Sequence, residues 1–230
     1  MNDNNPTQTF PHRKGLSLSM SLENISGLRV APRQAVAGRA VRLPYMVEDG
    51  CRRGGADTVW ALLDISGSMT GEPLEEAMRG FIDFCRAGVQ QGYRVGFIAF
   101  NDALHELSPA TDKIRDLEES IQNLYAGGGT IMAAPIRHAA EKMKEASGAR
   151  VIFLVTDGFP ADPEETVTLA QDCHRDGIDI IALGTGSADH EFLKRLASRT
   201  DLARHVPQTE LHLSIAQTSR LLLKSVSRPR

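Results

Sequence analysis

The sequence is poor in cysteine, aromatic residues and long apolar runs. Only 3 of its 230 residues are cysteine, and Cys51, Cys85 and Cys173 lie far apart, which excludes a dense disulfide framework and the close spacing of zinc ligands. No run approaches the roughly 18 apolar residues of a membrane-spanning helix. The first residues lack the charged and apolar regions of a secretory signal. We therefore expect a cytoplasmic protein with reduced thiols and no membrane partner.

A strong charge of one sign is also missing. The formal net charge is −3, which argues against a nucleic-acid partner because such partners select basic proteins. The apolar fraction of 41% and the charged fraction of 24% are typical of a globular protein with a real core. Basic residues gather only near the end of the sequence, and we treat residues 226–230 as a solvated basic tail.

The chain divides into a polar first part and a regular second part. Residues 1–55 are irregular and rich in proline, but residues 16–22 alternate strictly between apolar and polar side chains, which is typical of a strand. Residues 37–43 are a second short strand candidate. This N-terminal extension is either a β-hairpin or arm that packs on the domain or a partner, or a mostly flexible segment. Residues 56–225 form the main domain.

Strands and helices alternate through the main domain. The expected strands are short apolar runs at 58–63, 94–100, 151–155 and 178–183, with an antiparallel edge strand at 103–107. Helices are expected at 73–90 and 112–125, from Pro135, from Asp162 to Gly177, after Asp189 and after Thr209. Asp162 and Glu165 are predicted to form a capping box. The pattern predicts a Rossmann-like, doubly wound α/β fold, with a mostly parallel sheet and helices on both faces.

Oxygen-bearing side chains follow two of the expected strands. Asp64, Ser66 and Ser68 lie on a tight turn after the first strand, and Asp157 follows the strand at 151–155. Thr130 comes directly after three glycines, which permit close approach of the backbone. In doubly wound sheets, ligands bind beyond the carboxyl ends of the strands. Carboxylates and hydroxyls suit a hard divalent cation such as Mg2+, which retains some of its water.

The five residues in this order resemble the metal-ion-dependent adhesion site of the von Willebrand factor A (vWA) family. That site reads Asp-x-Ser-x-Ser, then a distant Thr and a distant Asp, and the resemblance extends over about residues 56–225. It implies Mg2+ or Mn2+ held by Ser66, Ser68 and Thr130, with Asp64 and Asp157 acting mainly through water. It also implies stand-alone cytosolic bacterial relatives that serve as adaptors.

Neutral hydroxyls leave a bound cation much of its charge, so a partner's Asp or Glu carboxylate would complete its coordination. The leading hypothesis is therefore a non-enzymatic, metal-dependent protein-binding module. The resemblance suggests a partner in an ATPase-linked, stress-resistance or defence system. On the loops around the metal we expect a rim of residues that contact the partner. The predicted rim residues are Met69, Thr70, Asn101, Tyr125 and Phe159, with His105 nearby.

Other interpretations remain open. Asp64 and Ser66 are also suited to capping the next helix, and the segment from Thr156 to Gly158 reads equally as a simple turn. The metal is structural in a second hypothesis, in which the N-terminal extension binds the partner. A third is a phosphatase-like enzyme with Asp64 as nucleophile, although Ser66 occupies the place of the second aspartate of such enzymes. Residues 183–188 resemble a dinucleotide loop only weakly and are better explained as a turn.

Overall fold

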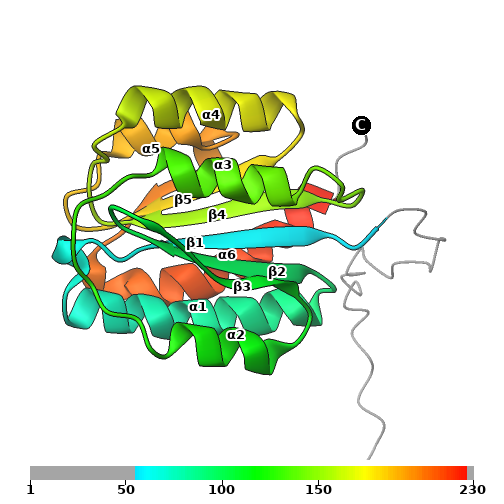
Figure 1. The fold of residues 1–230 in the computed structure, drawn as a ribbon, viewed down its shortest axis with the longest axis horizontal. Coiled ribbons are helices and arrows are strands. Elements are labelled where there is room, and N and C mark those ends of the chain that lie inside the picture. The colour runs from blue at the N-terminus through cyan, green and yellow to red at the C-terminus, as the bar shows by residue number, and fades with distance from the viewer. Residues whose placement is uncertain (1–54, 227–230) are drawn as a thin grey trace, which may run out of the picture. The chain divides into compact units, whose positions relative to one another are not determined.

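The computed structural model describes residues 55–226. Apart from their boundary residues, the predicted N-terminal extension and the basic tail fall outside the described residues, so the strands predicted at 16–22 and 37–43 stay predictions. The described part forms a central sheet in the order β3-β2-β1-β4-β5-β6 (Figure 1). All neighbouring strands are parallel except β2 and β3, which are antiparallel.

The strands are short and most are buried. They are β1 (Thr58–Asp64), β2 (Arg94–Phe100), β3 (Leu104–Thr111), β4 (Arg150–Thr156), β5 (Asp179–Gly184) and β6 (Ala203–His205). The predicted fold class is confirmed, and four parallel strands lie close to their predicted ranges. β6 was not predicted, because three residues with a single apolar side chain carry no strand pattern. It pairs with β5 from Ala203 to His205.

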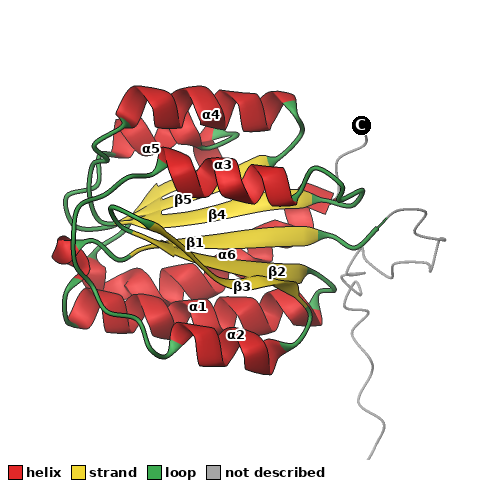
Figure 2. Ribbon diagram, in the orientation of Figure 1, coloured by secondary structure: helices red, strands yellow, loops and turns green. Residues whose placement is uncertain are grey.

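Helices cover both faces of the sheet (Figure 2). One face carries α1 (Glu72–Gln90), α2 (Ile114–Ile121) and α6 (Leu211–Val226), and the other carries α3 (Ala133–Lys142), α4 (Pro163–Arg175) and α5 (His190–Leu196). Short 3-10 turns are found at Gly67–Met69, Thr200–Leu202 and Gln208–Glu210. The helix predicted at 112–125 ends earlier, at Ile121, and the rest of that range belongs to the loop that carries Thr130.

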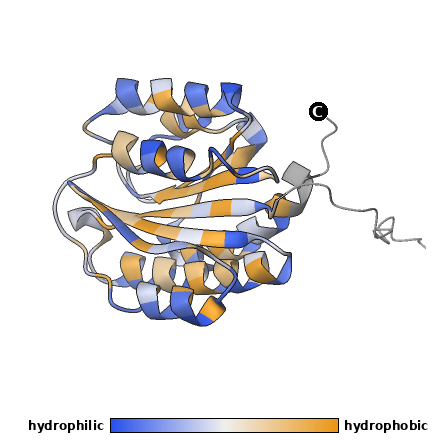
Figure 3. Ribbon diagram, turned by 45° about the vertical axis from the view of Figure 1, so that its right-hand side comes forward, coloured by the Kyte–Doolittle hydropathy of each residue, from blue (hydrophilic) through white to orange (hydrophobic). Residues whose placement is uncertain are grey.

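Hydrophobic residues are frequent along the strands and alternate with hydrophilic ones along the helices (Figure 3), and most of the hydrophobic residues on the strands are buried. Beneath α1, the rings of Phe81, Phe84, Phe97 and Phe153 form one cluster with centroids 4.7–6.2 Å apart. All four side chains are fully buried. Burial of such rings supplies much of the hydrophobic stabilisation of a domain, so this cluster fixes α1 and therefore the loop that precedes it.

Two glycines permit close packing in this core. A Cβ atom on Gly96 would lie 2.5 Å from the Trp60 ring, so β2 has no side chain where the indole of β1 crosses it. A Cβ atom on Gly80 of α1 would lie 2.8 Å from the Cβ of Ile215 and 2.9 Å from the backbone oxygen of His212 in α6. The two helices therefore cross at Gly80 with their backbones close together.

Further contacts fasten α6 to α1 and to the segment that follows α1. The Tyr93 hydroxyl donates a hydrogen bond of 2.9 Å to the backbone oxygen of Leu222, and His212 Nε2 lies 3.0 Å from Asp83 Oδ2. Thr209 was expected to cap this last helix, but it lies within the preceding 3-10 turn, Gln208–Glu210. The helix itself begins at Leu211.

The predicted capping box at α4 is wrong. Pro163 does begin the helix and Gly177 does follow it with a φ of +74°, but Asp162 makes no side-chain cap to α4. Its two carboxylate oxygens instead accept hydrogen bonds from the backbone amides of Met132 and Ala133, at 3.0 and 2.8 Å. The carboxylate thus satisfies the free amides at the start of α3, which need an acceptor as much as those of α4 do.

Candidate metal centre

Asp64 is the fixed point of the site. It ends β1, is fully buried, and uses both carboxylate oxygens within the protein. Oδ1 accepts a hydrogen bond of 2.8 Å from the Ser66 amide, and Oδ2 accepts one of 2.6 Å from the Thr156 hydroxyl. Asp64 therefore shapes the turn after β1 and ties it to the end of the neighbouring strand β4. It does not cap α1, whose N-cap residue is Gly71.

Thr156 belongs to the candidate site through its contact with Asp64, and the sequence analysis missed it. It is fully buried at the end of β4, directly before Asp157. Its hydroxyl also accepts a hydrogen bond of 3.2 Å from the Gly158 amide. The signal that identifies it is positional, because β1 and β4 are parallel neighbours and the ends of such strands meet at one edge of the sheet. A hydroxyl at this place is suited to hold the Asp64 carboxylate.

The serines bring the first turn to the second aspartate. Ser66 Oγ lies 3.2 Å from Ser68 Oγ, and the Ser68 hydroxyl donates a hydrogen bond of 2.8 Å to Asp157 Oδ1. Ser66 and Asp157 are buried, whereas Ser68 is exposed. The structure thus brings together four of the five predicted site residues through direct contacts, with Ser68 on the open side.

Thr130 reaches the same edge of the sheet on a glycine-rich loop. The Gly67 amide donates to the Gly128 oxygen at 3.0 Å, and the Gly127 amide donates to the Ile65 oxygen at 2.8 Å. These bonds hold the loop against the turn that carries the serines. The Thr130 hydroxyl makes no hydrogen bond with residues 55–226, and it lies 4.0 Å from where a Cβ atom of Gly158 would be. It is therefore free to contact a ligand next to Asp157.

A second turn supports Asp157 from behind. The backbone amide and the hydroxyl of Ser187 both donate to the Asp157 backbone oxygen, at 3.0 and 2.9 Å. Residues 185–188 therefore form a turn that supports the site, whereas the first two residues of the predicted turn, Leu183 and Gly184, belong to β5. Asp189 then accepts a hydrogen bond of 2.7 Å from the Phe192 amide and caps α5, as predicted.

The electrostatics of the two carboxylates favour a cation. Burial raises the pKa of Asp64, and the nearby charge of Asp157 adds to this against the hydrogen bonds from Thr156 and Ser66. Burial also raises the pKa of Asp157, against the bond from Ser68. Each charge is thus held where water stabilises it poorly, and a bound cation would relieve that cost.

The donor set fits a hard divalent cation. All five side chains offer oxygen only, and three of them are neutral hydroxyls, which matches the preference of Mg2+ and Mn2+. Across residues 55–226, no group of three or more His, Cys, Asp or Glu side chains is placed to hold a metal. Ser66, Ser68 and Thr130 would contact the ion, while Asp64, with both oxygens engaged in hydrogen bonds, would orient the turn.

The predicted rim divides into exposed and buried residues. Tyr125 and Phe159 are 84% and 53% exposed, and Thr70 is exposed with its hydroxyl bonded to the Gly67 oxygen. Asn101 braces the loop, because its amide nitrogen donates to the Gly127 oxygen at 2.7 Å. Met69 was predicted on the rim, but its side chain is fully buried in the core. It anchors the turn and offers no surface to a partner.

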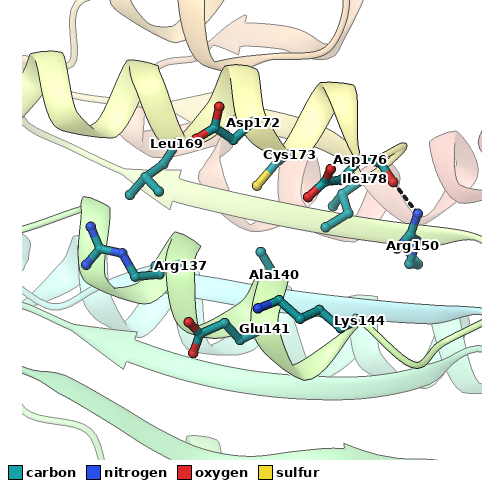
Figure 4. Close-up of a pocket in the computed structure, with 10 residues that line it drawn as sticks. All are labelled: Arg137, Ala140, Glu141, Lys144, Arg150, Leu169, Asp172, Cys173, Asp176 and Ile178. Carbon is teal, nitrogen blue, oxygen red and sulfur yellow. Dashed lines mark hydrogen bonds between the residues drawn. The ribbon is translucent and has the colours of Figure 1, made fainter.

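A separate groove lies between α3 and α4 (Figure 4). Its volume is about 390 Å³, and its lining includes Arg150 at the start of β4 and Ile178 just before β5. These residues mark the amino ends of the strands, so the groove lies at the opposite edge of the sheet from Asp64 and Asp157. It contains none of the predicted site residues.

A family model matches most of the chain. The model of the von Willebrand factor type A domain covers residues 59–218, a range that contains all five site residues. The fold is that of a Rossmann-like α/β domain, with oxygen-bearing side chains gathered at the carboxyl ends of β1 and β4. The chain belongs to the von Willebrand factor type A domain family.

Known proteins show how far the similarity extends. A von Willebrand factor A domain-containing protein of Dictyostelium discoideum is 28% identical over 103 residues, or 42% of this chain. The chain spans only 12% of that relative's length.

Among solved structures, the vWF domain of the type V pili tip protein Mfa5 from Porphyromonas gingivalis has a TM-score of 0.68 at 14% identity. That comparison covers 77% of this chain and 98% of the Mfa5 chain. Proximal thread matrix protein 1 from the mussel byssus, solved with a zinc-occupied MIDAS motif, has a TM-score of 0.57 at 15% identity, over 74% of this chain and 46% of its own. These similarities show the fold.

No helix within the described part of the chain has the length and apolar character needed to cross a membrane.

Proposed function

We propose that this domain is a non-enzymatic protein-binding module that holds Mg2+ or Mn2+ at Asp64, Ser66, Ser68, Thr130 and Asp157. The observation that carries the proposal is the connected set of oxygens at the carboxyl edge of the sheet, from Thr156 through Asp64 to the serines and Asp157. A bound cation would supply the positive charge that attracts a partner's Asp or Glu carboxylate.

The side chains of the protein prepare this site for binding. Asp64 fixes the turn through its two hydrogen bonds, and Ser68 stands exposed at the opening, where an incoming carboxylate arrives. On the loops that carry Thr130 and Asp157, the exposed rings of Tyr125 and Phe159 offer apolar contact area, and aromatic side chains often contribute strongly to protein interfaces. The mussel protein with a zinc-occupied motif supports the choice of this site for a metal.

Hydrolytic chemistry is disfavoured at Asp64. A nucleophilic carboxylate needs a free oxygen that reaches its substrate, whereas both Asp64 oxygens accept hydrogen bonds inside a fully buried site. We therefore keep the phosphatase-like enzyme only as the alternative. The other alternative, in which the metal is structural and the N-terminal extension binds the partner, is separated by experiment.

The test compares the full chain with a Ser66→Ala/Ser68→Ala variant and with Thr168→Ala, a control on the exposed side of α4. Mn2+ binding is measured by titration calorimetry, and partner capture from the source cells is compared in Mg2+ and in EDTA. We expect the double variant to lose both metal binding and capture, while the control keeps both. Capture that survives the double substitution and EDTA would refute the proposal and point to residues 1–54.

A further inference from the structure

The loops around the candidate metal centre contain no cationic side chain. Five of these loops follow the carboxyl ends of β1, β2, β4, β5 and β6, and a sixth precedes α3. They comprise residues 65–71, 101–103, 157–162, 185–189, 206–210 and 122–132. None of these segments contains lysine, arginine or histidine, although the chain has 26 lysine and arginine residues and 7 histidines. The only charged side chains within these segments are therefore acidic, and exposed His105, His190 and His205 lie just outside them.

Most of the aspartates on these loops are engaged within the protein. Asp157 accepts from Ser68, Asp162 from the amides at the start of α3, and Asp189 from the Phe192 amide. Asp102 differs, because it is exposed and makes no hydrogen bond or ion pair with any residue between 55 and 226. Its charge is available to a partner.

Asp102 lies directly against the loop that delivers Thr130. A Cβ atom on Gly128 would lie 2.5 Å from Asp102 Oδ2, and one on Gly129 would lie 2.6 Å from Oδ1. The carboxylate thus occupies space that only glycines leave open. The neighbouring Asn101 holds the same loop through the Gly127 oxygen. The free carboxylate therefore lies against the two glycines that directly precede Thr130, at the border of the candidate metal centre.

We propose that the partner presents a lysine or arginine beside its metal-directed carboxylate, and that this basic side chain pairs with Asp102. The inference rests on the proposed function. It follows from charge complementarity: a partner carboxylate approaches loops that contain acidic residues and no lysine or arginine, and a neighbouring basic residue of the partner offsets the repulsion. Tyr125 and Ile131 are exposed on the loop that carries Thr130, and they offer apolar contact area to the same partner.

The experiment selects random displayed peptides on the immobilised full chain in Mn2+. We expect the recovered sequences to contain Asp or Glu with Lys or Arg within a few positions. Synthetic copies of the most enriched peptide are then titrated by fluorescence anisotropy, with the basic residue kept or replaced by glutamine. Asp102→Asn should weaken binding of the basic peptide about twofold to fivefold, the range for an exposed ion pair. It should leave the glutamine peptide unchanged.

Asp112→Asn is the matched control, because Asp112 is an exposed carboxylate between β3 and α2, outside the rim loops. It should change neither titration. Peptides that need Mn2+ and an acidic residue but show no basic preference, or a basic preference that survives Asp102→Asn, would overturn this inference and leave the proposed function standing. Recovery of no metal-dependent peptide, or equal recovery by the Ser66→Ala/Ser68→Ala variant, would overturn both.

Discussion

Replacement of Asp64 by asparagine tests the electrostatic description of the site. The amide is nearly isosteric with the carboxylate, so its oxygen still accepts from the Ser66 amide at the position of Oδ1. Its NH2 group would donate to the Thr156 hydroxyl, which in turn has the Gly158 oxygen as an acceptor 3.3 Å away. The hydrogen bonds are thus conserved, and the main change is the loss of a buried charge.

The sign of the stability change follows from the raised pKa of Asp64. A carboxyl whose pKa is higher in the folded than in the unfolded state opposes folding when it is ionised. This cost is present above the folded-state pKa and disappears as the pH falls below the ordinary value for aspartate. In EDTA at neutral pH, the Asp64→Asn variant should therefore be more stable than the wild type, and the difference should close on acidification.

The magnitude is measurable by thermal unfolding. Each kcal/mol of added stability moves the midpoint of a domain of this size by about 2–4 °C. We expect the midpoint of the variant to lie above that of the wild type in EDTA at pH 7.5, because burial raises the pKa of Asp64. At 100 times its dissociation constant, Mn2+ would stabilise the wild type by about 2.7 kcal/mol, and the variant should lose most of this gain.

Asp112→Asn again serves as the control and should melt like the wild type under both conditions. A variant that is less stable than the wild type in EDTA at neutral pH would contradict the reasoning. Such a result would mean that the hydrogen bonds to the charged form of Asp64 outweigh the cost of its burial.

Three further predictions concern the core. Gly96→Ala should destabilise the fold by about 1–3 kcal/mol in urea unfolding, because the new methyl group overlaps the Trp60 ring; an unchanged midpoint would show that the ring can shift. Gly80→Ala should also lower the midpoint, despite the better helix propensity of alanine, since its methyl group meets Ile215 of α6; a gain in stability would mean that α6 moves away freely. Burial raises the pKa of Cys173 to about 11, so at pH 8 iodoacetamide should label this thiol only after unfolding; rapid labelling of the native chain, read by peptide mass spectrometry, would contradict its burial.

The sequence predicted the sheet well because its buried strands are distinctive. β1 and β4 are nearly continuous apolar runs, and short runs of this kind are typical of parallel strands that helices cover on both faces. β6 was not predicted because it is a strand through its pairing with β5, and its own three residues show no strand pattern. The length of α2 was overestimated because apolar spacing continues to Leu124, while the chain already leaves the helix at Ile121.

The sequence could indicate candidate site residues where the type of side chain by itself suggests a ligand for a cation. Carboxylates and hydroxyls in a known order predicted the candidate metal centre, but the hydrogen-bond partners of these side chains depend on packing across the sheet. Thr156 and Asp162 illustrate this, because both bind atoms that are distant in sequence: Asp64 and the start of α3. Met69 appeared exposed on a loop, whereas the turn directs it into the core. Local patterns contain no information on such long-range contacts.

The attachment of α6 to α1 has a consequence for synthesis of the chain. Asp83 and His212 are 129 positions apart, as are Tyr93 and Leu222. During translation, α1 leaves the ribosome long before the helix that covers it, so its crossing surface at Gly80 stays bare until α6 emerges. Long-range contacts of this kind slow folding, and exposed apolar surface on nascent chains promotes aggregation. We expect this domain to complete its fold only after release of residue 222, and to depend on chaperones until then.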